Sequence, residues 1–123
     1  MRIDWFNRLA VLVAGILGAG GVAAAAAATH SGGALLAPLS LVALTQAPVL
    51  LAVGLSPVTA IGPRIGALVI GIGALLFAAD LGVRHMWGPS LFPYAAPVGG
   101  TSMILGWVIL GLSGLFLRSR RAP

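Results

Sequence analysis

The residues of this sequence with the clearest chemical potential are ionisable side chains inside long apolar runs. Asp80 is the only acid within such a run, and a charged side chain at mid-bilayer costs about 2.5–3.5 kcal/mol to insert. Arg84 follows four residues later, on the same helical face and in the favourable order for an ion pair. Two interpretations stay open. Asp80 is either an acid paired locally near the membrane boundary, or a proton-relay acid or docking charge for a partner subunit.

A second polar group consists of Thr45, Gln46 and Pro48 in the preceding apolar run. Pro48 has no N–H to donate to the carbonyl of Leu44, which predicts a kink. The Gln46 amide can bond that carbonyl or reach across to another helix. We expect such a structural role, because one Gln and one Thr do not line a conduction path.

His30 and His85 are the two histidines, and both fall at the ends of apolar runs on one membrane side. Neither has a carboxylate at ligand spacing, so we expect interfacial anchoring and no metal or haem. The absence of cysteine excludes disulfides, thiolate metal sites and iron–sulfur clusters. No nucleophile–base pair or phosphate loop is visible either. The sequence therefore predicts no catalytic, cofactor-binding or metal-binding residue, and no enzyme.

The elements that position these residues follow from the composition. Hydrophobic residues make up 59% of the chain and charged residues 7%, whereas soluble domains contain about 25% charged residues. Four apolar runs cover about 9–29, 34–55, 65–83 and 97–117, each near the length that spans a bilayer. Lipid leaves only helices for such segments, and short loops make neighbours antiparallel. We therefore expect an all-α membrane protein, one domain over residues 1–123, folded as a four-helix up-down bundle.

The distribution of arginine predicts the orientation of this bundle. Only Arg84 falls on one side of the membrane, and the other six arginines share the opposite side: Arg2, Arg8, Arg64, Arg118, Arg120 and Arg121. The positive-inside rule then places both termini in the cytoplasm. These arginines lie where they meet lipid head groups and are not interleaved with aromatics, so we expect membrane lipids and not nucleic acid as partners.

Aromatic residues near the ends of the apolar runs are expected to anchor the protein at the two interfaces. Trp5 lies at the cytoplasmic side, and Trp87 and Tyr94 lie with the histidines at the outer side. The N-terminal run, which ends in the alanines of 23–28, also resembles a secretory signal peptide. Its apolar part is long for such a peptide, and we therefore expect a retained first helix.

Small residues at three- or four-residue spacing are expected to pack the helices together, because they let backbones approach closely in lipid. The candidates are Ala14, Gly18 and Gly21 in the first run, Ala67, Gly71, Ala74 and Ala78 in the third, and Gly111 and Gly114 in the fourth. Gly62 and Gly66 match a GxxxG pattern, but we expect little from them because Pro63 and a loop lie there.

Residues 97–107, PVGGTSMILGW, resemble the signature P-[VI]-G-G, small residues, L-x-G-W of domain-of-unknown-function family 423, a group of small bacterial membrane proteins. Residues 21–30 and 75–81 resemble two further motifs of that family. The resemblance implies four transmembrane helices and no established activity. Two departures are that Gln46 stands where a histidine is common and Asp80 where a small polar residue is common.

Within that signature, each residue type has a physical interpretation. Pro97 suits the first turn of a helix, and Gly99 and Gly100 allow close approach by a neighbour. Trp107 is expected to be a packing residue.

Two functions remain after these exclusions. We expect an accessory or structural subunit that docks onto a larger membrane protein complex, with Asp80 or the outer loop as a contact. The expected protein partner is such a complex or, in the other case, further copies of the chain in a homo-oligomer. The alternative is a small oligomeric transporter or channel that uses Asp80 and Gln46. Arginine as the sole cation and abundant alanine and glycine are typical of a GC-rich bacterial genome, so we expect a multi-pass protein of the bacterial inner membrane.

Overall fold

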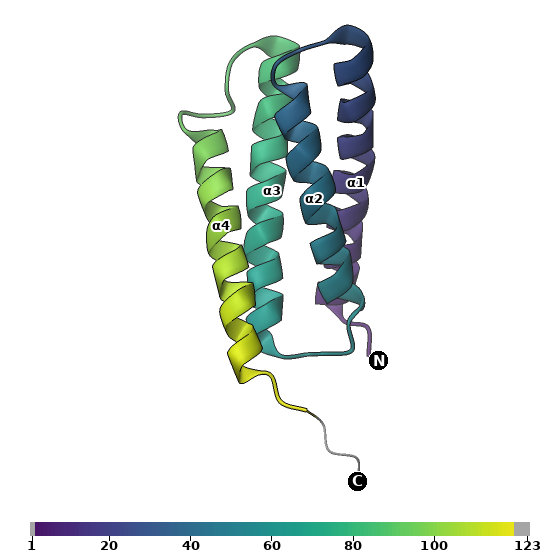
Figure 1. Cartoon of the computed structure of the whole chain (residues 1–123), viewed down its shortest axis with the longest axis vertical. Coiled ribbons are helices and arrows are strands. Elements are labelled where there is room, and N and C mark those ends of the chain that lie inside the picture. The colour runs from purple at the N-terminus through teal and green to yellow at the C-terminus, as the bar shows by residue number, and fades with distance from the viewer. Residues whose placement is uncertain (1, 120–123) are drawn as a thin grey trace.

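The computed structural model describes residues 2–119 as four antiparallel helices in an up-down arrangement (Figure 1). The helices are α1 (Trp5–Ser31), α2 (Leu36–Leu55), α3 (Ile61–Trp87) and α4 (Ala95–Ser113), and a short 3-10 turn, η1 (Gly114–Phe116), continues α4. Each of the four is long and apolar enough to cross a membrane, and residues 2–119 contain no strand. The chain is thus an all-α multi-pass membrane protein, as predicted. Arg120 and Arg121, which contributed to the predicted orientation, lie outside the described residues.

The first and third helices extend beyond their apolar parts, and the boundaries predicted for them were therefore wrong. The first helix begins at Trp5 instead of residue 9, because Asp4 caps it. The Asp4 carboxylate accepts the Asn7 backbone N–H at 3.2 Å, and the Asn7 side chain accepts the Asp4 N–H at 2.9 Å. This reciprocal pair satisfies two donors that a helix start leaves free. The third helix starts at Ile61 and ends at Trp87, so Arg64 and Arg84 are helical and not loop residues.

The four helices do not close into a compact bundle, because α4 packs on α3 at one edge. The central helix is α3, which contacts each of the other three. The first two helices pair closely, α3 packs against α2 and partly against α1, and α4 packs almost entirely against α3. Figure 1 shows α4 at the edge of the molecule, on the far side of α3 from α1. Three small or apolar residues of α3 are fully buried at this centre, Ala67, Ile70 and Ala74.

Paired glycines bring the backbones of α3 and α4 together. A Cβ atom added to Gly73 would lie 2.6 Å from the carbonyl oxygen of Gly99, and one added to Gly106 would lie 2.9 Å from that of Gly66. Within each helix the two glycines are seven residues apart, which is about two turns. Glycine is therefore required at these positions, because a side chain would push the two helices apart.

Two expectations about small residues were wrong. Gly62 and Gly66 lie in the first turns of α3 and not in a loop, and both face α4. The Cβ position of Gly62 is 2.6 Å from the Cβ atom of Ser113. The Cβ positions of three glycines expected at interfaces have no other helix within 4 Å among residues 2–119: Gly18, Gly111 and Gly114. Spacing along a helix does not determine which of its faces meets another helix.

Candidate functional site

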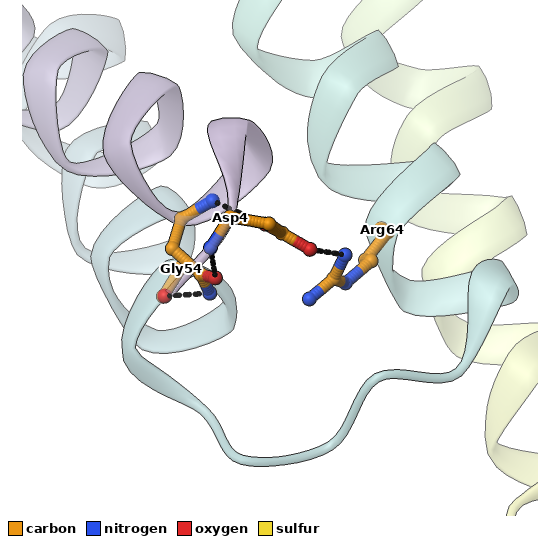
Figure 2. Close-up of polar contacts among 4 residues, drawn as sticks. Asp4, Gly54 and Arg64 are labelled. Carbon is orange, nitrogen blue, oxygen red and sulfur yellow. Dashed lines mark hydrogen bonds and ion pairs between the residues drawn. The ribbon is translucent and has the colours of Figure 1, made fainter. Parts of the chain in front are cut away.

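A network of polar contacts joins three helices at the end of the molecule where α1 begins (Figure 2). An Arg64 guanidinium nitrogen, Nη1, donates to Asp4 Oδ2 at 2.7 Å and links α3 to the start of α1. The Asn7 amide donates to the carbonyl oxygen of Gly54 at 2.7 Å and links α1 to the end of α2. We call these four residues, Asp4, Asn7, Gly54 and Arg64, the N-terminal clamp.

The electrostatics of this clamp are set by unequal burial. The Arg64 side chain is 15% exposed and that of Asp4 42%. The Arg64 guanidinium carbon lies 4.7 Å from the centre of the Phe6 ring, a cation–π contact. The hydrogen bond from Arg64, and then that from the Asn7 backbone, hold the pKa of the Asp4 carboxyl below its usual value. The acid therefore stays ionised and keeps its partner through the ordinary pH range.

Sequence reasoning missed the clamp as a site, although part of its signal was present. Arg64 was used only to orient the chain, and Asp4 and Asn7 were not singled out. Their three-residue spacing matches a capping pair, so the sequence alone could have predicted that α1 begins directly after Asp4. The contact between Asp4 and Arg64 was not, because 60 residues separate them.

Asp80 lies at the opposite end of the bundle and is 1% exposed. Its Oδ1 atom accepts the backbone N–H of Leu91 at 2.9 Å. The expected partner, Arg84, is present but its nearest nitrogen is 4.0 Å away. The main contact of Asp80 is therefore with the loop between α3 and α4, a partner that the sequence did not suggest.

That loop, residues 88–94, turns sharply before α4 begins. Gly88 has a φ of 94° and Tyr94 a φ of 66°. The left-handed conformation costs a non-glycine residue about 1–2 kcal/mol, so the loop must be held by contacts elsewhere. The hydrogen bond from Leu91 to the buried Asp80 carboxylate is one of these contacts.

Gln46 and Trp107, both singled out from the sequence, lie together. The Trp107 indole N–H donates to Gln46 Oε1 at 2.8 Å and links α4 to α2. Gln46 in turn donates to the Thr45 hydroxyl at 3.0 Å, and Thr45 donates to the Leu41 carbonyl at 2.7 Å. Of the two partners considered for Gln46, it takes the one on another helix. The α2 helix continues past Pro48 to Leu55.

The glycines of the family-like signature differ in their surroundings. Gly99 is buried against Gly73, whereas nothing in the described part of the chain lies within 4 Å of the Cβ position of Gly100. Pro97 lies in the first turn of α4. Only the first of the two glycines therefore takes part in a close helix contact.

The predicted interfacial residues lie exposed at helix ends. Trp5 begins α1, His30 is in its last turn, and Trp87 ends α3. The ring of His85 lies beside Gly33, with its Cε1 atom 2.8 Å from the Cβ position there. Within residues 2–119, no group of three or more His, Cys, Asp or Glu is placed to hold a metal ion.

No protein-family model matches the chain, and no curated protein or solved structure is significantly similar to it. The resemblance to family 423 therefore stays a prediction.

Proposed function

We propose that this protein is an accessory subunit, without catalytic activity of its own, that docks onto a larger protein complex in a bacterial inner membrane. The observation that carries the proposal is the exposure of α4. Only 17% of its membrane span is buried inside the chain, compared with 44% for α3. A helix held along one side only leaves most of its surface to neighbours in the membrane.

The outer surface of α4 has the composition of a docking face. Four large apolar residues on this surface are at least 50% exposed: Ile104, Leu105, Val108 and Leu112. Trp107 of the same helix is 44% exposed, and its hydrogen bond to Gln46 on α2 fixes the indole in place. Aromatic anchors held in one conformation contribute strongly to protein interfaces, because little side-chain freedom is lost on binding.

The polar groups in the spans favour a structural role over chemistry. The hydroxyls of Thr101 and Ser102 donate to backbone carbonyls, of Pro97 on the same helix and of Val69 on α3. Asp80 and Gln46 also have partners within the chain, Leu91 and Trp107. Groups that are occupied in this way stabilise helix contacts and are not free to activate a substrate.

Co-purification at native expression level tests the proposal. A tagged chain extracted in mild detergent should be recovered in fixed stoichiometry with a larger membrane complex, as measured by native mass spectrometry. The variant Ile104→Trp adds bulk to the proposed docking face and should lose this partner. Ile16→Trp is a matched control on α1, because Ile16 and Ile104 are 55% and 68% exposed.

Two results would contradict the accessory-subunit proposal. The first is recovery of the chain alone or only with copies of itself. The second is equal loss of the partner in both tryptophan variants. The transporter alternative is tested in liposomes, where proton flux that disappears in Asp80→Asn would support transport instead.

A further inference from the structure

An apolar groove lies between α1 and α3, and Leu50 of α2 also contributes to its lining. It has a volume of about 120 Å³. Its walls include Phe6, Leu9 and Val13 of α1 and Leu68, Ile72 and Leu75 of α3. Because these side chains are apolar and the groove is open, a flexible hydrocarbon chain fits its chemistry.

A largely buried cation, Arg64, lies beside one of the residues that line this groove. Phe6 lines the groove, and the Arg64 guanidinium lies over the Phe6 ring at 4.7 Å. The Arg64 side chain projects from α3 toward the start of α1 (Figure 2). The apolar groove therefore leads to a positive charge near the end of the spans, where a lipid head group lies.

Arg64 keeps hydrogen-bonding capacity after its contact with Asp4. A guanidinium has five N–H donors, and the hydrogen bond to Asp4 uses a donor on Nη1. Its Nε atom is buried and has no partner among the described residues. A buried donor without an acceptor is unfavourable, and a phosphate oxygen is an acceptor that guanidinium groups bind well.

The surrounding charges favour an anionic head group over a neutral one. Arg2 and Arg8 flank the start of α1 and are exposed, and Asp4 is the acid beside them. Basic residues near a membrane surface each add about 1 kcal/mol of attraction to anionic lipid. Asp4 opposes that attraction, since it already shares the Arg64 charge.

We propose that the α1–α3 groove and Arg64 form a binding site for one anionic phospholipid of the leaflet in which α1 begins. An acyl chain occupies the groove, and the phosphate accepts hydrogen bonds from Arg64. This site is independent of the docking face on α4, so either proposal can fail without the other.

Lipid titration followed by native mass spectrometry tests the site. The purified protein is titrated with phosphatidylglycerol and with phosphatidylcholine of the same acyl chains. Phosphatidylglycerol should bind in preference, and Arg64→Gln should reduce that preference about fivefold, as expected for one basic residue. Asp4→Asn should increase it, because the variant removes the competing carboxylate.

The opposite signs of these two variants separate a lipid site from a purely structural ion pair. If Arg64 only holds α1 to α3, both substitutions break the same contact and change lipid binding in the same direction, which would overturn the proposal. Arg118→Gln is the matched control at the same end of the molecule. An equally large loss in that variant would also overturn the proposal, because it would indicate attraction to the whole surface.

A groove variant keeps the test valid if Arg64→Gln does not fold. Ile72 is 64% exposed, so Ile72→Trp is tolerated while its ring obstructs the groove. This variant should lose the bound phosphatidylglycerol and keep its helical circular dichroism. Unchanged binding in folded Ile72→Trp would show that the groove does not hold the chain.

Discussion

At each end of the bundle an aspartate lies close to an arginine, and the two pairs are arranged in opposite ways. At the end where α1 begins, the arginine is the more buried partner: Arg64 is 15% exposed and Asp4 42%. At the other end the acid is buried: Asp80 is 1% exposed and Arg84 39%. The first pair joins two helices at 2.7 Å, and the second lies within one helix at 4.0 Å.

This difference shows that a favourable sequence spacing does not identify the stronger contact. Arg84 is four residues from Asp80, and the sequence therefore suggested it as the partner. The carboxylate instead makes its short hydrogen bond to the backbone N–H of Leu91. At the other end, two residues with no local relationship form the closer pair, because the packing of α3 beside α1 brings them together.

The substitution with the largest expected effect on stability disrupts the glycine contacts between α3 and α4. It tests whether the polar contacts at the two ends of the bundle are enough to hold α4 in place. Gly99→Leu should destabilise the protein by about 3 kcal/mol or more, because even a Cβ atom there would lie 2.7 Å from the Gly73 carbonyl oxygen. Thermal or denaturant unfolding in detergent measures the loss. The control is Gly100→Leu, where the Cβ position is open, and equal losses in both variants would contradict the close contact.

The next effect concerns the buried acid. Asp80→Ala should lower stability by about 1–3 kcal/mol, since it leaves the Leu91 N–H without its acceptor. Asp80→Asn should lose less, because an amide oxygen still accepts that bond. Hydrogen exchange should show faster exchange at Leu91 in the alanine variant, and slow exchange there would contradict loop anchoring by Asp80.

A smaller effect is expected from the other member of that pair. Arg84→Gln should cost less than about 1 kcal/mol, because Arg84 is 39% exposed and 4.0 Å from the carboxylate. The measurement is the same unfolding experiment. A loss equal to that of Asp80→Ala would mean that the ion pair, and not the loop contact, holds Asp80.

The smallest expected effect is a dependence of the protein's stability on pH, which comes from Asp4 in the N-terminal clamp. The Asp4 pKa is lower in the folded protein than its ordinary value of 3.8. Its contribution to stability is therefore fully present above that value and is lost as the pH falls through the folded-state pKa. The free energy of unfolding, measured between about pH 7 and about pH 3, should decrease as the pH falls, and this decrease should be smaller in Asp4→Asn. The same drop in both proteins would assign it to other groups.

Much of the fold could be predicted because lipid imposes strict rules on a sequence. Apolar runs of about 20 residues must be helices, and short loops make them antiparallel. The boundaries were less accessible, since helices such as α3 continue into polar turns that hydropathy does not mark. The glycines that bring α3 and α4 together are seven residues apart in each helix. Many other glycines have similar spacings, and only the contacts in the structure show which of them lie at a helix interface.

The sequence by itself determined that this chain has four segments able to span a membrane. It also determined that Asp80 and Gln46, as polar residues within those segments, would need partners in the membrane. Those results follow from composition and from the cost of polar groups in lipid. Only the tertiary structure decided which partners these residues take, that α4 lies at an open edge, and that Arg64 meets Asp4 and Phe6. The reason is physical. Lipid offers little hydrophobic drive between helices, so short-range packing and hydrogen bonds decide how they associate.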